Sequence, residues 1–203
     1  MLSRSLRSIL LIEPTPQSVS AAKQIGKEID VVSSKELAPK NCQKFYKLNR
    51  QLKPEDVHDL KLDFGKYSHI IMNHDALGRG VLPRLAAILN KSMISDVTKI
   101  SKTDYTRLMF AGNVVSTVKT EQKPVIMSIR ATAFPGTALE KSTITKDSIE
   151  LKPERVKTIN VQTSGGDRPE LGGAKIVVSG GRAVKSKENF KSFIGIHLGS
   201  LNH

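Results

Sequence analysis

The apolar residues of this chain fall in short runs, the longest of which is Leu85–Leu89. A helix that crosses a membrane needs about 20 consecutive apolar residues, so an integral membrane protein is not expected. Runs of four or five residues are typical of buried strands, and their alternation with helical patterns favours an α/β fold. With 203 residues, the chain is long enough for one sizeable core or two small ones.

The first part of the chain shows this alternation clearly. The run Ile9–Ile12 ends before Pro14 and Pro16, which predicts a buried strand followed by a turn. Ser18 is placed to cap a helix after that turn. The apolar face of this helix, at spacings of three and four residues, comprises Val19, Ala22, Ile25 and Ile29.

Further elements continue the α/β pattern. Strands are expected at Val31–Val32 and His69–Met72, and a second helix at Val81–Asn90. The lysine-rich segment 33–66 between the two strands has no firm period. Strand, helix and strand at these intervals predict an α/β domain.

From Ile94 onward the pattern changes to short strands separated by turn residues. Strands are expected at residues 94–100, 105–111, 114–118 and 125–130, joined as hairpins. In the last of them, Val125, Met127 and Ile129 alternate with the residues between them, the pattern of a half-buried strand. The α/β domain is therefore expected to continue into a β-rich extension.

Charge restricts the kinds of partner. The chain has 32 basic and 19 acidic residues, a net charge of +13, which admits a nucleic acid, a membrane surface, a nucleotide or an acidic protein. Aromatic residues make up only 4% of the chain and tryptophan is absent, so platforms for stacking bases are scarce. No nucleic-acid-binding motif is recognisable either.

Few residues suggest catalysis or metal binding. Cys42 is the only cysteine, which excludes an internal disulfide and favours a reducing compartment. Three nearby lysines could lower its pKa, but no general base accompanies it. His69 and His74 lack the four-residue spacing of helical metal ligands, so structural or surface roles are expected. No catalytic residue and no metal site is predicted.

The first eight residues contain two arginines, three serines and no acid. This composition is typical of organellar transit peptides. The alternative is a flexible N-terminus before a first strand. The apolar stretch Ile9–Ile12 is too short for the core of a secretory signal.

The later part of the chain divides into a linker and a second unit. Residues 134–166 are rich in Ser, Thr and Lys and are interpreted as a surface segment or linker, with one strand at Val156–Val161. The glycines of Ser164–Gly166 mark the natural break. The second unit is expected to begin at Asp167.

The most distinctive local pattern is Lys175-Ile-Val-Val-Ser-Gly-Gly-Arg182. It predicts a strand at Ala174–Val178, then a glycine turn, then a helix from Lys187. Glycines after a strand permit close backbone approach, and a helix N-terminus with basic side chains favours an anion. The pattern lacks the GxGxxG and Walker spacings, so a plain tight turn is the alternative to a nucleotide or phosphate rim.

Several stretches that occur in order make a more specific pattern. They are Gly78-Arg-Gly-Val-Leu-Pro-Arg-Leu-Ala-Ala87, Ile94-Ser-Asp96, Phe110-Ala-Gly-Asn113, Thr117-Val-Lys119, Asp167-Arg-Pro-Glu-Leu171, Val177-Val-Ser-Gly-Gly-Arg182 and Lys185 to Lys191. Together they resemble the alpha subunit of electron transfer flavoprotein, from about Ile9 to Lys191.

The resemblance implies an N-terminal α/β domain followed by a flavin domain, in a heterodimer with a beta subunit in the mitochondrial matrix. It also favours the transit-peptide interpretation. Family members perform no substrate chemistry of their own. They accept electrons on FAD from acyl-CoA and related dehydrogenases of fatty acid beta-oxidation and pass them to a membrane quinone oxidoreductase.

The resemblance also assigns FAD-binding residues. Arg182 matches a family FAD-contacting position, with its guanidinium near the isoalloxazine side, and Gly180 and Gly181 would permit close approach. The later flavin-domain segments of the family, such as Val-Gly-Ala-Ser-Arg and Gly-Gln-Thr-Gly, do not occur in this sequence. One charge-assisted hydrogen bond contributes about 1.5–3 kcal/mol, whereas nanomolar binding needs about 12 kcal/mol. Weak or no FAD binding is therefore expected for the isolated chain.

The expected architecture is α/β, with a three-layer domain and a mostly parallel sheet. Its parts are a transit segment at 1–8, the N-terminal domain with its β-rich extension at 9–132, a linker at 133–166, the truncated start of a doubly wound flavin domain at 167–191, and an atypical tail at 192–203. The leading hypothesis is an electron carrier of this family that contacts a beta subunit. The second is a non-redox protein that uses the same domain to bind a partner, and the third is a basic nucleic-acid-binding protein.

Overall fold

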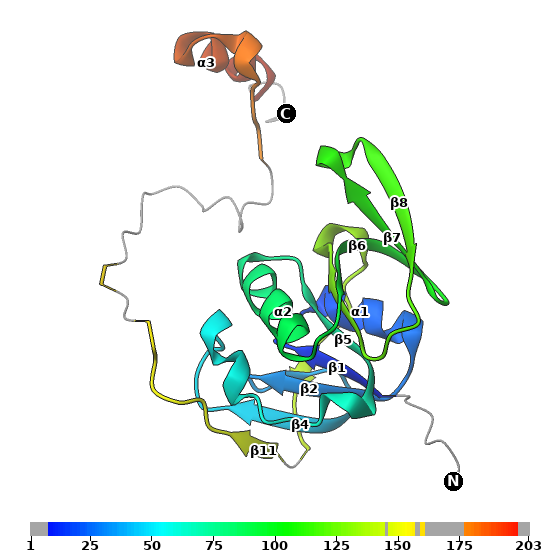
Figure 1. Cartoon of the computed structure of the whole chain (residues 1–203). Helices are drawn as coiled ribbons and strands as arrows, with labels where there is room; N and C mark the ends of the chain where they lie inside the picture. Colours follow the sequence, from blue (N-terminus) through cyan, green and yellow to red (C-terminus); the bar gives the residue numbers. More distant parts are fainter. Residues whose placement is uncertain (1–7, 145, 157–158, 161–176, 199–203) are drawn as a thin grey trace. The chain divides into compact units, whose positions relative to one another are not determined.

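The computed structural model describes residues 8–144, 146–156, 159–160 and 177–198 (Figure 1). The chain divides into two compact units between Val156 and Lys157, and each is described by itself. Residues 1–7 of the predicted transit segment lie outside the described residues, and Ser8 already belongs to the first strand. No helix in the described ranges is long and apolar enough to cross a membrane.

A large sheet forms the centre of the first unit. Its strand order is β11-β4-β2-β1-β5-β9-β6-β7-β8. The strands are β1 (Ser8–Ile12), β2 (Ile29–Ser33), β4 (Cys42–Leu48), β5 (Tyr67–Asn73), β6 (Met93–Ser101), β7 (Asp104–Met109), β8 (Val114–Lys119), β9 (Val125–Ile129) and β11 (Lys146–Ile149). The short strands β3 (Leu37–Ala38) and β10 (Glu140–Lys141) pair separately.

In this sheet the described strands from β11 to β6 run parallel to one another, whereas β7 pairs antiparallel with both β6 and β8. Helices α1 (Pro16–Ile25) and α2 (Ala76–Ile88) belong to two different apolar clusters. In β1, Ile9 and Leu11 pack in the cluster of α1, whereas Leu10 packs in the cluster of α2. Both faces of the central strands are therefore covered, and the predicted α/β fold with a mostly parallel sheet is confirmed.

Helix α1 begins earlier than predicted. Its N-cap is Thr15, not Ser18, and Pro16 occupies the first helical position, where its fixed φ is favourable. The Thr15 hydroxyl accepts from the Ser18 N–H, while the Ser18 hydroxyl accepts from the Thr15 N–H, a reciprocal capping box. The helix ends before Gly26, whose backbone is extended, so Ile29 begins β2 instead of lying on the helix.

Helix α2 also begins earlier than the predicted Val81. The Asp75 carboxylate caps it by accepting from the Gly78 N–H at 2.8 Å. A Cβ on Gly78 would lie 1.9 Å from the Asn73 carbonyl oxygen. The first turn of α2 therefore requires glycine at position 78. Because this glycine interrupts the apolar periodicity, the sequence pattern placed the start of the helix too late, at Val81.

Strand β9 differs from the prediction in two ways. It is inserted between β5 and β6 and runs parallel to both, so no hairpin joins it to β8. All of its residues are buried, so the inference of a half-buried strand was wrong. Ser128, its only polar residue, is buried because its hydroxyl has hydrogen-bond partners. The hairpins β6–β7 and β7–β8 form as predicted.

Two segments that looked irregular in the sequence supply strands. The lysine-rich segment 33–66 contains β4, which pairs in parallel with β2. The predicted linker contains β11, which pairs in parallel with β4, and its Phe134 and Leu151 are buried in the first unit. Val156, Ile159 and Asn160 lie outside any strand, while Val161 and the predicted break 164–166 fall outside the described residues.

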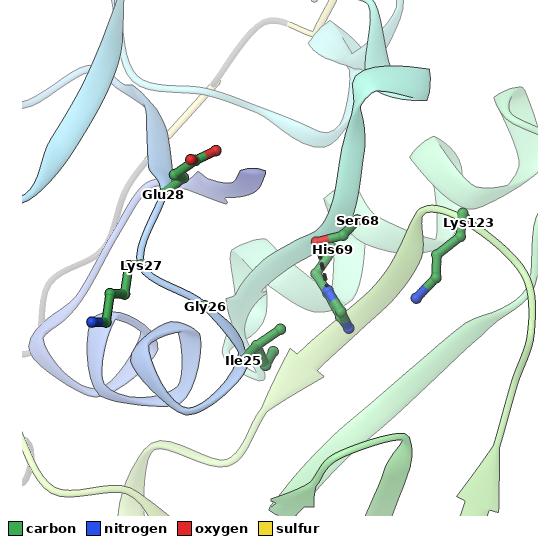
Figure 2. A pocket seen from close by; sticks show the side chains of 7 residues that line it. All are labelled: Ile25, Gly26, Lys27, Glu28, Ser68, His69 and Lys123. Carbon is green, nitrogen blue, oxygen red and sulfur yellow. Dashed lines mark hydrogen bonds between the residues drawn. The ribbon is translucent and has the colours of Figure 1, made fainter. Parts of the chain in front are cut away.

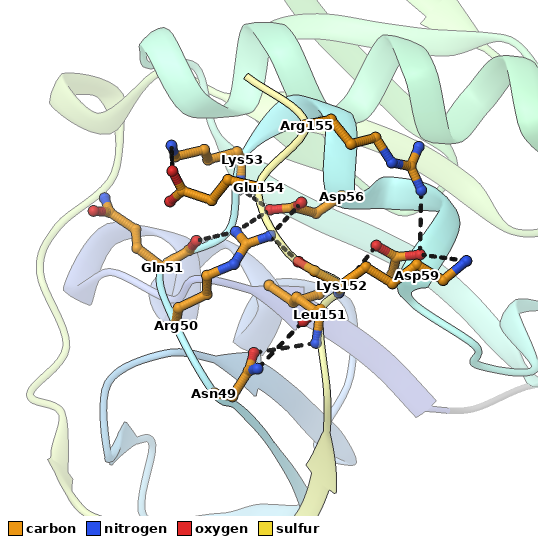
Figure 3. Close-up of polar contacts among 10 residues, drawn as sticks. All are labelled: Asn49, Arg50, Gln51, Lys53, Asp56, Asp59, Leu151, Lys152, Glu154 and Arg155. Carbon is orange, nitrogen blue, oxygen red and sulfur yellow. Dashed lines mark hydrogen bonds and ion pairs between the residues drawn. The ribbon is translucent and has the colours of Figure 1, made fainter. Parts of the chain in front are cut away.

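The chain after β11 is held against the 3-10 turn η1 (Pro54–Asp59) by two buried carboxylates (Figure 3). Arg50 donates two hydrogen bonds to Asp56, at 2.6 and 2.8 Å, and one to the Lys152 carbonyl at 2.7 Å. Asp59 accepts from the Lys152 N–H and from Arg155. These contacts hold residues 151–155 against η1 within the first unit.

Candidate functional site

The predicted site residues Gly180, Gly181 and Arg182 lie together in one turn of the second unit. Arg182 opens the 3-10 turn η5 (Arg182–Val184), and helix α3 (Lys187–Leu198) follows, as predicted from the sequence. The preceding Val177 and Val178 do not form a strand and are 55% and 49% exposed. The remaining residues of the predicted strand, 174–176, and the stretch 167–171 lie outside the described residues.

The chain enters α3 through a left-handed residue and a serine cap. Lys185 has φ 63°, and the Ser186 Oγ accepts from the Asn189 N–H at 3.1 Å. The backbone of Glu188 and the Ser186 hydroxyl donate hydrogen bonds that hold the pKa of the Glu188 carboxyl below its usual value. An acid in the first turn interacts favourably with the helix dipole. The start of α3 is therefore fixed by its own side chains.

The two glycines have different roles. A Cβ on Gly180 would lie 2.8 Å from the Phe190 ring and 3.0 Å from Val184. Gly180 is therefore needed for packing the turn against α3. A Cβ on Gly181 would meet nothing within 4 Å, so this position leaves open space beside the backbone.

A hollow of about 480 Å³ lies at this turn. Its described lining carries three cations and no carboxylate: Gly180, Gly181, Arg182, Val184, Lys185, Ser186, Lys187 and Phe190. The Arg182 side chain makes no hydrogen bond or ion pair with any residue that the structure describes. The volume of this hollow is within the usual range of small-molecule sites. The positive charge of its lining favours an anionic group.

A second hollow, of about 470 Å³, lies in the first unit near the start of β5 (Figure 2). Its lining comprises Ile25, Gly26, Lys27, Glu28, Ser68, His69 and Lys123. The polar groups do not converge on one point, because the Lys27 side chain points away from His69 in Figure 2. We therefore assign no ligand to this hollow.

His69 has a structural role at the base of the second hollow. Its Nδ1 lies 2.9 Å from the Ser68 Oγ and its Nε2 lies 2.8 Å from the Tyr105 hydroxyl. The Ser68 hydroxyl donates its proton to the Ser8 carbonyl, so toward His69 it can only accept, from the Nδ1–H of the ring. The Nε2 of His69 is then unprotonated and accepts from the Tyr105 hydroxyl. Burial, together with the nearby charge of Lys123, lowers the pKa of His69 from 6.5 to about 4.

His74 lies at the opposite end of β5, so the two histidines do not form one site. Its Nδ1 contacts the Ser128 Oγ at 2.9 Å, which also accepts from the Asp96 N–H at 3.0 Å. The Arg130 guanidinium pairs with Asp96 and lowers the pKa of that carboxyl. This cluster, which sequence reasoning missed, joins β5, β6 and β9. The one feature of the sequence that could have indicated this cluster is Ser128, a single polar residue within an apolar strand.

Cys42 is buried, and its Sγ donates to the Lys44 carbonyl at 3.1 Å. Burial, followed by the charge of Asp30, raises its pKa to about 11. The expectation that nearby lysines could lower this pKa was wrong: only backbone hydrogen bonds at Lys44 and Val31 lower it, and burial with the charge of Asp30 outweighs them. Across the described ranges, no group of three His, Cys, Asp or Glu side chains is placed to hold a metal ion.

Comparison with known proteins identifies the family. The model of the electron transfer flavoprotein domain matches residues 57–161, just over half of the chain. The chain is 34% identical over 196 residues to a probable mitochondrial electron transfer flavoprotein subunit alpha from Caenorhabditis elegans, covering 87% of this chain and 59% of the relative.

Two further relatives are similar. The mitochondrial alpha subunit from Arabidopsis thaliana is 39% identical over 139 residues, covering 63% of this chain and 38% of the relative. The alpha subunit from Pseudomonas aeruginosa is 32% identical over 179 residues, covering 86% and 56%. The chain thus spans about two fifths to three fifths of the length of these relatives. With the family model matched over more than half of its residues, the chain belongs to the electron transfer flavoprotein family.

Proposed function

We propose that this chain is an alpha-subunit-like electron carrier that works with a beta subunit and performs no substrate chemistry of its own. It would accept electrons from acyl-CoA and related dehydrogenases of fatty acid beta-oxidation and pass them to the quinone pool. The family match over residues 57–161 is the observation that carries the proposal. The described turn and α3 would belong to the start of a flavin domain at residues 167–191.

The described residues fit part of an FAD molecule. FAD, when bound, supplies reversible acceptance and donation of electrons. Arg182 has an exposed guanidinium without a described side-chain partner, suited to an anionic or carbonyl edge. Gly181 leaves space for that edge to approach the backbone, and Gly180 supports the turn through its packing on Phe190. Lys185 and Lys187 add positive charge beside it.

These residues alone would hold FAD weakly. A charge-assisted hydrogen bond to Arg182 contributes about 1.5–3 kcal/mol, whereas a nanomolar dissociation constant corresponds to about 12 kcal/mol. The hollow at the turn is also bounded only by the loop and one helix face. We therefore propose that tight binding requires contacts beyond this turn, and that the beta subunit supplies them in the complex.

We propose the mitochondrial matrix as the location. Two of the relatives described above are mitochondrial proteins. The first eight residues carry two arginines and no acid, which suits a transit segment. Fusing residues 1–8 to a fluorescent protein and following its import into isolated mitochondria tests this part of the proposal.

The central experiment is co-expression of the chain with a candidate beta subunit, followed by native mass spectrometry and a visible absorbance spectrum. A heterodimer with one flavin per complex is the expected result. Arg182→Gln should then reduce the bound flavin. Lys191→Gln is the matched control, because it removes a cation from the following helix α3, outside the hollow.

The other outcomes separate the hypotheses. A colourless heterodimer would overturn the electron-carrier proposal and support the non-redox partner-binding protein instead. A chain that forms no heterodimer and holds no flavin contradicts both. Equal flavin loss in the Arg182 and Lys191 variants would remove the assignment of Arg182 as a flavin contact.

A further inference from the structure

Strand β8 (Val114–Lys119) is an edge of the sheet with one side of its backbone unpaired among the described residues. On its other side it pairs with β7 along its whole length without a register shift. Figure 1 shows the β7–β8 hairpin projecting beyond the rest of the first unit. An unpaired row of N–H and C=O groups is a template for another strand.

The composition of β8 does not protect this edge. Four of its six residues are β-branched, there is no proline, and its one charge, Lys119, stands at the end. Val115 is 68% exposed and Val114 is 43% exposed. The opposite edge strand, β11, has only four residues and includes Lys146 and Asp147. Short length and charge are devices that block edge pairing. Strand β8 is longer than β11, and its single charge stands at its end.

We propose that β8 pairs antiparallel with β8 of a second copy of this chain, with Ser116 at the twofold axis. Directly opposed residues of an antiparallel pair point to the same face, so a symmetric pair must be centred on a residue. Centring on Ser116 places Val115 opposite Thr117 of the second copy and Val114 opposite its Val118. Between Val114 and Val118, the pairing joins apolar and hydroxyl side chains only.

The neighbouring register is less favourable. Centring on Thr117 would place the exposed Val115 opposite Lys119 of the second copy. With Ser116 at the centre, Lys119 instead lies opposite Asn113. The two Lys119 residues are then about 20 Å apart, beyond the screening length of about 8–10 Å at ordinary ionic strength. The register therefore avoids local repulsion although the chain carries a net charge of +13.

The size of the contact sets the strength of the pair. A six-residue strand pair buries less surface than the roughly 1,200–2,000 Å² of a stable interface. The dimer is therefore weak and reversible, and its population rises with protein concentration. This inference uses only residues of the first unit and none of the Arg182 turn.

A charge exchange at the twofold axis tests the register. In Ser116→Lys, like charges face each other, so sedimentation velocity of the full chain should show a dissociation constant raised about threefold or more. Ser116→Glu should weaken association less than Ser116→Lys, because Arg107 lies directly opposite residue 116 on β7 and offsets the negative charge. An equimolar mixture of the two variants should regain the association, because lysine then faces glutamate. Ser148→Lys, on the exposed edge strand β11, is the matched control and should leave association unchanged.

A cross-link offers a second test that keeps the strand nearly native. In Ser116→Cys the two Cβ atoms would be about 4.5–5.5 Å apart, close to disulfide distance. Mild oxidation of Ser116→Cys should give a covalent dimer, whereas the control Ser148→Cys should stay monomeric. The native Cys42 should not cross-link, because it is buried. A chain that is monomeric at every concentration, or unaffected by Ser116→Lys, overturns the proposal. Edge-dependent binding to a beta subunit without self-association would overturn it too.

Discussion

Removing the imidazole of His69 should flatten the pH dependence of stability in the first unit. His69 is 5% exposed and both of its ring nitrogens have hydrogen-bond partners, Ser68 and Tyr105. The neutral ring satisfies this environment, whereas an imidazolium would carry a buried charge with no described carboxylate partner among its contacts. Protonation therefore opposes folding.

The magnitude follows from the two pKa values. Burial lowers the pKa of His69 from 6.5 to about 4. Between these values the unfolded chain binds a proton that the folded chain does not, so the folded state loses stability as the pH falls. The loss is about 1.4 kcal/mol per pH unit, and between pH 7.5 and pH 5.0 it amounts to about 2 kcal/mol.

The assay is urea unfolding of the wild-type chain and of His69→Gln at a series of pH values from 7.5 to 5.0. Because other groups titrate equally in both chains, the difference between the two stability curves isolates His69. That difference should shrink by about 2 kcal/mol across the range. His58→Gln, which removes an exposed histidine, is the control. Parallel curves for the wild type and His69→Gln would refute the reasoning.

Three further changes test other parts of the structure. In urea unfolding, Asp56→Ala should lower the free energy of unfolding by about 3 kcal/mol, because it removes one partner of a buried ion pair with Arg50. The control Glu154→Gln, which breaks a more exposed ion pair with Lys53, should lower it by less than about 0.5 kcal/mol. Gly180→Ala should speed proteolysis of the turn, because the added Cβ would collide with the Phe190 ring, whereas Gly181→Ala should leave the rate unchanged. Equal proteolysis rates for the two variants would contradict the separate roles of the two glycines. The Cys42 thiol should react with a disulfide reagent far more slowly in the folded chain than in urea, because burial raises its pKa to about 11; similar rates contradict that burial.

The fold was predictable where strands are apolar along their whole length. Strand β1 is a run of four apolar residues after Ser8, and the pattern located it directly. Strand β4 mixes Phe45 and Tyr46 with lysines, because its position toward the edge of the sheet leaves some side chains in solvent. Its period is therefore broken, and the chain looked irregular there. The insertion of β9 between β5 and β6 was unpredictable for another reason, since strand order depends on long-range pairing.

The turn at the candidate site was predictable because it is local, whereas its role as a flavin contact stays a prediction. Gly180, Gly181 and Arg182 are consecutive, so a sequence pattern contains the whole turn. The difference between the two glycines was not predictable, since it depends on how the turn packs against α3. The contact of His69 with Tyr105 joins residues 36 positions apart and arises from the packed fold. A contact between residues so far apart in the sequence produces no short motif from which it could be predicted.

Flavin binding and self-association should vary independently. The β8 edge and the Arg182 turn belong to different compact units, and the described apolar clusters of the first unit include no residue of the turn. Ser116→Lys should therefore weaken self-association without changing the flavin content of a complex with the beta subunit. Arg182→Gln should do the reverse. If either variant changes both properties, the two units are energetically coupled, and the assignment of one role to each unit is wrong.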